Sequence, residues 1–340
     1  MGGKALSCNV SIRLTKNNYV RLATLCVAKL QALYPAKRVA YLGSYRDKAD
    51  FGDCDILLEG GEDYDPYKAA AALDAVEVVR NGPVTSVGVI VRPEVPHRDG
   101  NVFQVDLIKM EPEAFDFAMS YFGHGDTGNL LGRIAHAQGL SLRHDGLFYY
   151  YRDGDYKFRE ILLTREFSEA LTFMGYNPDK LAQGFDSQEA IYRYVASSPF
   201  FNRDIFLLEN RNARSRVRDK KRLMYMGFLK WCEAHPELPA FVYPENKAEW
   251  LPRLVEFFPQ FQAEYGQATT DLSKQRAAKA KYNGELVSQL TGLKDKELGV
   301  LMARFKASFA SAELQQAFLL ASSPESIAQR ILQLQKDGAS

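Results

Sequence analysis

Two aspartates separated by a single residue lie where a glycine-containing turn leads into an apolar run. Residues 43–55 read Gly-Ser-Tyr-Arg-Asp-Lys-Ala-Asp-Phe-Gly-Asp-Cys-Asp, and apolar residues precede and follow this stretch. Residues two apart in a β-strand project from the same face, so Asp53 and Asp55 would present both carboxylates together while Cys54 faces the other side. Carboxylates paired in this way are typical ligands of a hard cation.

A third carboxylate lies in another run with the alternation of a strand. Over residues 102–108, apolar residues alternate with Gln104 and Asp106. If this strand lies beside the first, Asp106 joins the other two carboxylates on one surface. Three carboxylates repel one another unless cations lie between them, and oxygen ligands suit Mg²⁺ or Mn²⁺ held jointly with substrate phosphates. The sequence therefore predicts a site for two Mg²⁺ or Mn²⁺ ions that transfers phosphoryl or nucleotidyl groups.

The order of these motifs resembles a known superfamily. The Gly-Ser turn, the Asp-x-Asp pair and the lone strand aspartate are similar to the signature of polymerase β-type nucleotidyltransferases. Residues 121–129, Tyr-Phe-Gly-His-Gly-Asp-Thr-Gly-Asn, together with Arg133 and the motifs at 139–140 and 145–148, resemble family X DNA polymerases more narrowly. Residues 187–201 are similar to the thumb segment of bacterial members, and the resemblance covers roughly residues 10–205.

This resemblance implies an α+β fold, in which a polymerase β-type palm, a small mixed sheet with helices, precedes a largely helical C-terminal region. It implies that Asp53, Asp55 and Asp106 are both the metal ligands and the catalytic residues. The implied nucleotide-binding residues are Gly43, Ser44, Arg46, Arg13, Tyr121, Phe122, Asp126 and Asn129.

Within that set, the turn at Ser44 and Arg46 would hold the triphosphate through backbone N–H groups and a cation. The family usually has a basic pair here, whereas this chain has Arg46-Asp47 and one residue fewer before Asp53, so the side chain that reaches the phosphates stays open. Arg13 is either a further triphosphate contact or a solvated loop charge. Tyr121 and Phe122 would line the sugar, whereas Asp126 and Asn129 would lie at the base.

Arg133 has the spacing of a residue close to the templating strand in the family. His124, which replaces a residue that is normally glycine in this motif, is a candidate for lining the site.

The third strand departs from the family pattern. Family X enzymes commonly carry basic residues two before and two after the third aspartate, where this chain has Gln104 and Ile108. A glutamine can orient Asp106 but adds no positive charge, so we expect chemistry that is tuned differently.

The chain beyond residue 205 reads as a helical extension. We expect a palm with nucleotide-binding segment over 1–150, a thumb-like subdomain over 151–205 and a helical domain over 206–340. Residues 283–301 are faintly similar to a helix-turn-helix of tRNA nucleotidyltransferases and poly(A) polymerases. A basic run in this extension, followed by aromatic residues at helical spacing, predicts a phosphate-contact surface formed by Arg211, Arg214, Arg216, Arg218, Lys220, Lys221 and Arg222.

Composition adds few constraints. The 340 residues carry a net charge of only +1, so any nucleic-acid surface must come from local clustering. The four cysteines lack metal-ligand spacing, and no stretch reads as a signal peptide or membrane span. We therefore expect a soluble, intracellular, cytoplasmic monomer without a membrane partner. Residues 1–12 leave no room for the N-terminal lyase domain common in family X, so we expect no lyase activity.

Three functions follow as hypotheses. The first is a DNA polymerase X-like nucleotidyltransferase that adds dNMP from a dNTP to a DNA 3′ end, in repair or gap filling, by a two-metal mechanism. The second is an RNA or tRNA 3′-end nucleotidyltransferase, and the third is a catalytically weak nucleic-acid-binding protein.

Overall fold

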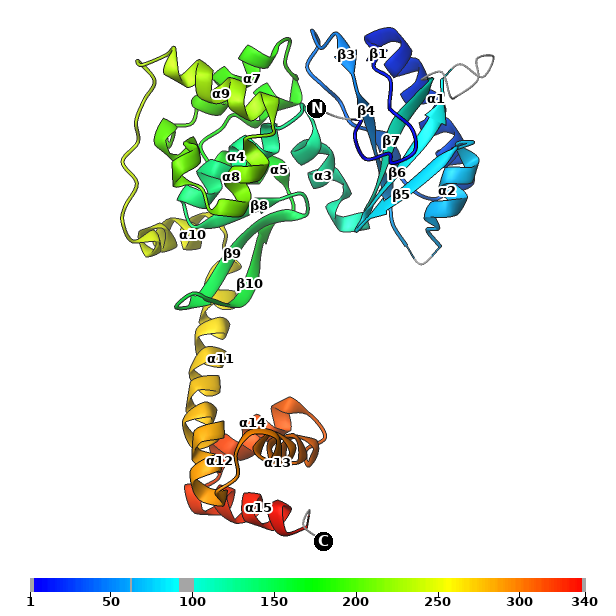
Figure 1. Ribbon diagram of the computed structural model, residues 1–340. Coiled ribbons are helices and arrows are strands. Elements are labelled where there is room, and N and C mark those ends of the chain that lie inside the picture. The colour runs from blue at the N-terminus through cyan, green and yellow to red at the C-terminus, as the bar shows by residue number, and fades with distance from the viewer. Residues whose placement is uncertain (1–2, 62, 92–100, 338–340) are drawn as a thin grey trace. The chain divides into compact units, whose positions relative to one another are not determined.

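The computed structural model describes residues 3–61, 63–91 and 101–337, which form an α+β protein, as the sequence predicted (Figure 1). The chain divides into two compact units. The N-terminal unit comprises Met1–Tyr150 and Leu162–Phe258, and the C-terminal unit comprises Tyr151–Ile161 and Pro259–Ser340. These two units differ from the three segments expected from the sequence. The division into a palm, a thumb-like subdomain and a helical domain stays a prediction.

A five-stranded mixed sheet forms the centre of the first half of the N-terminal unit. Its strand order is β2-β4-β7-β6-β5, with β4 and β7 parallel and the other pairs antiparallel. Both predicted carboxylate strands are central, so their backbone groups are paired on both sides. The strands are β2 (Val39–Tyr41), β4 (Asp53–Glu59), β5 (Glu77–Asn81), β6 (Val84–Ile90) and β7 (Val102–Met110).

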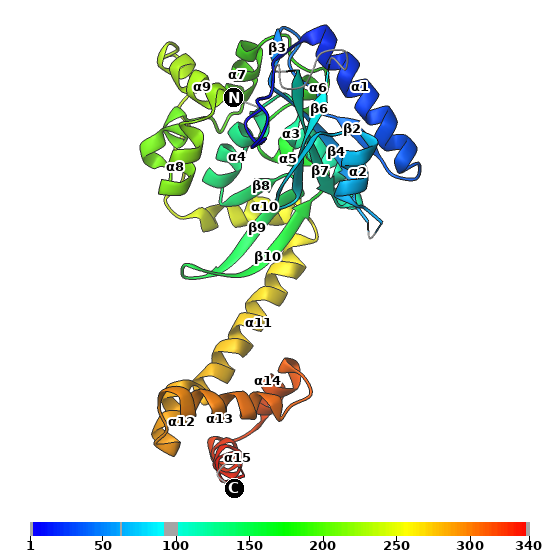
Figure 2. The ribbon, with the colours of Figure 1, turned by 45° about the vertical axis from the view of Figure 1, so that its right-hand side comes forward.

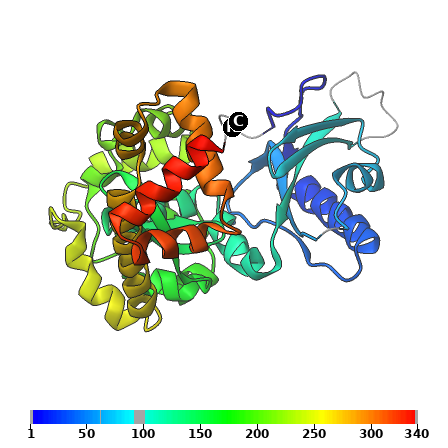
Figure 3. The same cartoon turned by 90° about the horizontal axis from the view of Figure 1, so that it is seen from below.

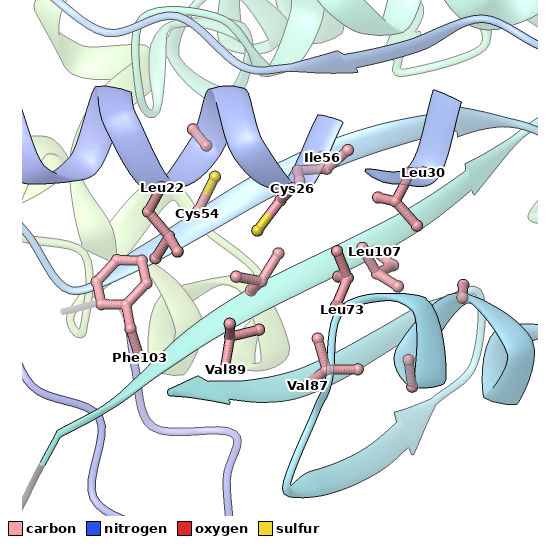
Figure 4. Close-up of a cluster of buried hydrophobic side chains, with 14 of the residues drawn as sticks. Leu22, Cys26, Leu30, Cys54, Ile56, Leu73, Val87, Val89, Phe103 and Leu107 are labelled. Carbon is pink, nitrogen blue, oxygen red and sulfur yellow. The ribbon is translucent and has the colours of Figure 1, made fainter. Parts of the chain in front are cut away.

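Helices α1 (Lys16–Leu33) and α2 (Pro66–Ala72) cover one face of this sheet. Leu22, Cys26 and Leu30 recur at helical spacing and pack on the strands (Figure 4). Cys54 lies in this core as a buried free thiol, as expected for the residue between Asp53 and Asp55.

The other face packs against α3 (Phe115–Phe122), whose Phe115 and Ala118 contact Leu57 and Ile108. Helix α4 (Thr127–Ala137) follows after a short turn. A Cβ at Gly128 would lie 2.2 Å from the carbonyl oxygen of Tyr121, so only glycine permits this close approach of α4 to the end of α3.

The remaining elements of the N-terminal unit are mainly helical. Helix α9 docks through its aromatic residues, because Tyr225 and Phe228 are fully buried and Phe228 packs edge-on against Phe206 at 4.9 Å between ring centroids. A two-stranded sheet of β1 and β3 lies near the start of the unit, and β8, β9 and β10 form a three-stranded sheet, of which residues 151–161 belong to the C-terminal unit. Their bounds are β1 (Leu14–Thr15), β3 (Asp50–Phe51), β8 (Leu140–Arg143), β9 (Gly146–Asp153), β10 (Tyr156–Thr164), η2 (Pro112–Ala114), α5 (Phe167–Phe173), α6 (Pro178–Ala182), α7 (Gln188–Ala196), η3 (Arg203–Phe206), η4 (Leu208–Asn210), α8 (Ala213–Asp219), α9 (Leu223–Glu233), η5 (Lys247–Trp250) and α10 (Leu251–Phe257).

The C-terminal unit is built on the long helix α11 (Phe261–Lys281), which contacts the outer part of the β9–β10 hairpin through an ion pair of 2.8 Å between Arg159 and Asp271. Four shorter helices gather around the C-terminal end of α11 (Figures 2 and 3). Gly292, with φ of +72°, makes the turn between the first two of them. The four are α12 (Gly284–Thr291), α13 (Asp295–Ala307), α14 (Ala312–Ala321) and α15 (Pro324–Lys336).

Within the described ranges, no helix is both long and apolar enough to cross a membrane.

Candidate active site

The structure brings the three predicted carboxylates together on one face of the sheet. Asp53 and Asp55 lie on β4, and Asp106 lies directly opposite Asp55 in the parallel register of β4 and β7. Asp53 is opposite Gln104 in the same register. Because both strands alternate their side chains, all three carboxylates face away from the α1 core that holds Cys54.

Burial and neighbouring negative charge destabilise the charged forms of Asp55 and Asp106. Burial raises the pKa of Asp55 to about 7, and the negative charges of Asp53 and Asp106 contribute to the shift. Burial also raises the pKa of Asp106, and hydrogen bonds from Ser86 and Gln104 oppose this rise. Crowded, buried carboxylates of this kind are electrostatically satisfied by a cation.

Gln104 orients Asp106. Its Nε2 donates to both carboxylate oxygens of Asp106, at 2.9 and 3.0 Å, and its Oε1 accepts from the backbone N–H of Ala5 at 2.8 Å. The backbone N–H of Gly3 donates to Asp53 Oδ2 at 3.2 Å. Gln104 therefore orients the Asp106 carboxylate, as expected, without adding a positive charge.

The chemistry of this donor set fits Mg²⁺ or Mn²⁺, because all of its ligand atoms are carboxylate oxygens. Across residues 3–61, 63–91 and 101–337, no group of three or more His, Cys, Asp or Glu side chains is arranged so that it could hold a metal ion. Mg²⁺ is commonly held by one or two carboxylates together with substrate phosphates and water.

A cleft of about 1350 Å³ opens in front of Asp53 and Asp55. Most residues predicted to bind nucleotide line this one cleft. They are Gly43, Ser44, Arg13, Tyr121, Phe122, Asp126 and Asn129.

Arg46 is the exception among the residues predicted to bind nucleotide. Its guanidinium donates to Asp186 Oδ1 at 2.5 Å and to the carbonyl oxygen of Gln183 at 2.6 Å, so the fold holds it against the segment before α7. Lys48 lines the cleft instead. Burial lowers the pKa of Lys48, while Asp53 and Asp55 favour its charged form.

Sequence reasoning missed Lys48. The signal was a second cation in the shortened loop between the Gly-Ser turn and Asp53. Arg13, at the edge of the cleft, forms an ion pair with Asp50.

Aromatic side chains form another part of the cleft wall. Tyr121 contacts Phe122 edge-on at 5.3 Å between ring centroids, and Phe122 stacks on His144 at 5.6 Å. His124 does not join them: its ring packs against Phe185 at 5.2 Å, and it is absent from the described residues that line the cleft. The structure therefore corrects the expectation that His124 lines the site.

The basic run is divided between the cleft and the fold. Arg214, Arg218, Lys221 and Arg222 line the cleft, and Lys220 is exposed outside it. The structure therefore does not bring all seven residues of the run to the cleft, and their contact with phosphates stays a prediction.

Two arginines of the run serve the fold instead. Arg211 is buried and pairs with the fully buried Asp219 at 2.7 Å. Arg216 donates to the carbonyl oxygens of Leu208 and Arg211, each at 3.0 Å.

Arg133 is also held by the fold. It is 8% exposed, and its Nε and Nη2 donate to the carbonyl oxygen of Ile205 at 2.9 and 2.6 Å. It lines a second cavity of about 370 Å³, which shares Tyr121, Asn129, His144 and Arg218 with the cleft. This placement does not favour contact of Arg133 with a templating strand.

Comparison of the chain with protein-family models gives no match, and a search of curated proteins gives none either.

Proposed function

We propose that the chain is a metal-dependent nucleotidyltransferase of the polymerase β type, similar to family X DNA polymerases. It would transfer dNMP from a dNTP to the 3′-hydroxyl of a DNA strand. One observation carries the proposal: Asp106 lies in register with Asp55 on the neighbouring strand, and Asp53 and Asp55 line a cleft that several cations also line. The mixed sheet with α1 and α2 on the opposite face supports a palm of this type.

The residues divide the reaction between them. Asp53 and Asp55 would hold both metal ions, and Asp106 would hold one. When bound, the ions neutralise charge on the reacting phosphate and the leaving pyrophosphate. Asp106, oriented by Gln104, is positioned to accept the proton of the attacking hydroxyl. Lys48 and the backbone of Gly43 and Ser44 would bind the triphosphate.

Two kinds of nucleic acid are candidates for the strand that accepts the nucleotide. The motifs from Tyr121 to Phe148 resemble DNA polymerases and favour DNA. The turn at Gly292 between α12 and α13 matches the faint helix-turn-helix similarity and favours an RNA 3′ end. A protein that binds nucleic acid without catalysis is the third possibility.

Extension of a labelled primer tests the proposal. Single-stranded, recessed and one-nucleotide-gap DNA and an RNA 3′ end are each incubated with dNTPs or NTPs in Mg²⁺ or Mn²⁺. We expect dNMP addition by the native protein and none by Asp106→Ala, with circular dichroism showing that the variant is folded. NMP addition to RNA alone would shift the acceptor to RNA. If the native protein binds nucleic acid in Mn²⁺ but adds no nucleotide, the proposed enzymatic activity is refuted.

A further inference from the structure

The end of α8, the turn that follows it and the start of α9 contact the two residues predicted to bind the nucleobase. Arg218 Nη2 donates to Asn129 Oδ1 at 3.1 Å. Arg222 forms an ion pair with Asp126, and the backbone N–H of Asp126 lies 3.2 Å from Met224 Sδ. Residues 218–224 therefore contact the start of α4, where a base was expected to bind.

Asp219, the next residue along the chain, holds the guanidinium of Arg218. The Nε of Arg218 donates to Asp219 Oδ1 at 3.2 Å, and Asp219 is itself fully buried and paired with Arg211. A guanidinium anchored through one edge keeps its remaining N–H donors in a constant direction. Arg218 also lines the cleft, so those donors are available to a ligand there.

Asn129 carries an unfilled hydrogen-bond donor beside Arg218. Its side-chain nitrogen is buried and has no hydrogen-bond partner in the part of the chain that the structure describes. Buried amide donors in folded proteins are nearly always paired, because an unpaired one loses its bonds to water. Asn129 lines the cleft, so a rotation of its side chain would bring this donor to an acceptor atom of a ligand there.

We propose that Arg218, Arg222 and Asn129 select the incoming nucleobase, so that the protein chooses the nucleotide without a templating strand. The inference rests on the proposed function and deepens it. Arg133, the residue that the family resemblance places near a template, is not among the described residues that line the cleft.

The chemistry of the three side chains defines the preferred base. Arginine offers only donors, and the free atom of Asn129 is a donor as well. Such a surface fits a base edge with two adjacent acceptors, which guanine offers at O6 and N7 and cytosine at O2 and N3. Adenine places a donor amino group beside its acceptor and fits worse. We expect guanine or cytosine nucleotides to bind at least about tenfold more tightly than adenine nucleotides.

Equilibrium binding without nucleic acid tests this choice directly. Each of the four dNTPs and four NTPs is titrated singly into the full chain with Ca²⁺ by calorimetry. Arg218→Lys and Arg222→Lys keep the charge that attracts a triphosphate but lose the planar guanidinium, so we expect the base preference to fall to within about twofold. Lys230→Ala, an exposed cation on α9 outside the cleft, should keep the native preference. Equal affinity for all bases, or an unchanged preference in both lysine variants, would overturn the inference.

Single-nucleotide extension separates this inference from the proposed function. The native protein should add the same base whichever base stands opposite in a template, and also with no template. If the template dictates the added base, transfer is real and protein-based selection is wrong. If nothing is added although binding remains base-selective, the selection surface stands and the proposed transferase does not.

Discussion

The acidic side of the cleft, formed by the strand carboxylates, was easier to predict from sequence than the basic side, formed by residues of the basic run. On the acidic side, Asp53, Asp55 and Asp106 all lie where strand alternation put them. On the basic side, a run that looked continuous is split: Arg218 faces the cleft, whereas Arg211 is buried in the fold. Strand pairing keeps residues two apart on one face, but a helix and its following turn rotate successive residues in all directions.

Removing one carboxylate should have the largest effect on activity. We expect Asp55→Asn to lower nucleotide transfer by about 10³-fold or more, because Asp55 would bridge both cations. The stability of the fold should not fall, since the change removes a buried charge that two neighbouring carboxylates repel. Steady-state extension rates and a thermal melt measure the two effects.

Asp116→Asn provides the matched control. Asp116 lies on α3 with an 86% exposed side chain and pairs with Arg38. Loss of activity in this variant equal to that of Asp55→Asn would contradict the role given to the strand carboxylates.

Removing the acid that anchors the basic side should have the largest effect on stability. Asp219→Ala leaves Arg211 buried and unpaired, so we expect the free energy of unfolding to fall by about 3–5 kcal/mol. Arg214→Ala, which alters a cleft-lining cation, should change it by no more than about 0.5 kcal/mol. Both tryptophans, Trp231 and Trp250, belong to the N-terminal unit, so their fluorescence during urea unfolding reports this unit. Equal stability of the two variants would refute the split of the basic run.

Two cations of the Gly-Ser loop should differ in their effect on triphosphate binding. We expect Lys48→Ala to weaken dNTP binding by about ten- to a hundredfold, the usual value of a hydrogen bond to a charged group. Arg46→Ala should weaken it less, because Asp186 and Gln183 already hold that side chain. Calorimetric titration of one dNTP with Ca²⁺ decides between them, and the reverse order would restore Arg46 as the phosphate ligand.

The smallest expected effect concerns the N-terminal segment that reaches the acidic side. Burial raises the pKa of Glu77, but hydrogen bonds from Cys8, Asn9 and Ser7 outweigh it and lower the pKa to about 2. The segment is therefore fully held above the ordinary glutamate pKa of about 4.5 and released as the pH falls toward about 2.

Hydrogen exchange at the amides of Ser7, Cys8 and Asn9 measures this release. Protection should fall over that pH range in the native protein, and should already be low at neutral pH in Glu77→Gln. Protection that is equal in both proteins at neutral pH would show that Glu77 does not hold the segment.

Much of the acidic side was predictable from sequence, whereas the basic side was not. Alternation and the order of motifs were enough for Asp53, Asp55, Asp106 and the α+β class. Lys48 lines the cleft whereas Arg46 bonds Asp186, and the sequence of the loop that holds both cations does not reveal which one turns inward. The burial of Arg133 depends on the carbonyl of Ile205, 72 residues away, and no local pattern reveals such a contact.

Binding of Mn²⁺ tests the central claim that the acidic side of the cleft is a divalent-cation site. Electron paramagnetic resonance counts free Mn²⁺ as it is titrated into the full chain with a non-hydrolysable dNTP. The account predicts two bound ions in the native protein and loss of both in Asp55→Asn, with binding intact in Asp116→Asn. Mn²⁺ binding by Asp55→Asn equal to that of the native protein would contradict it.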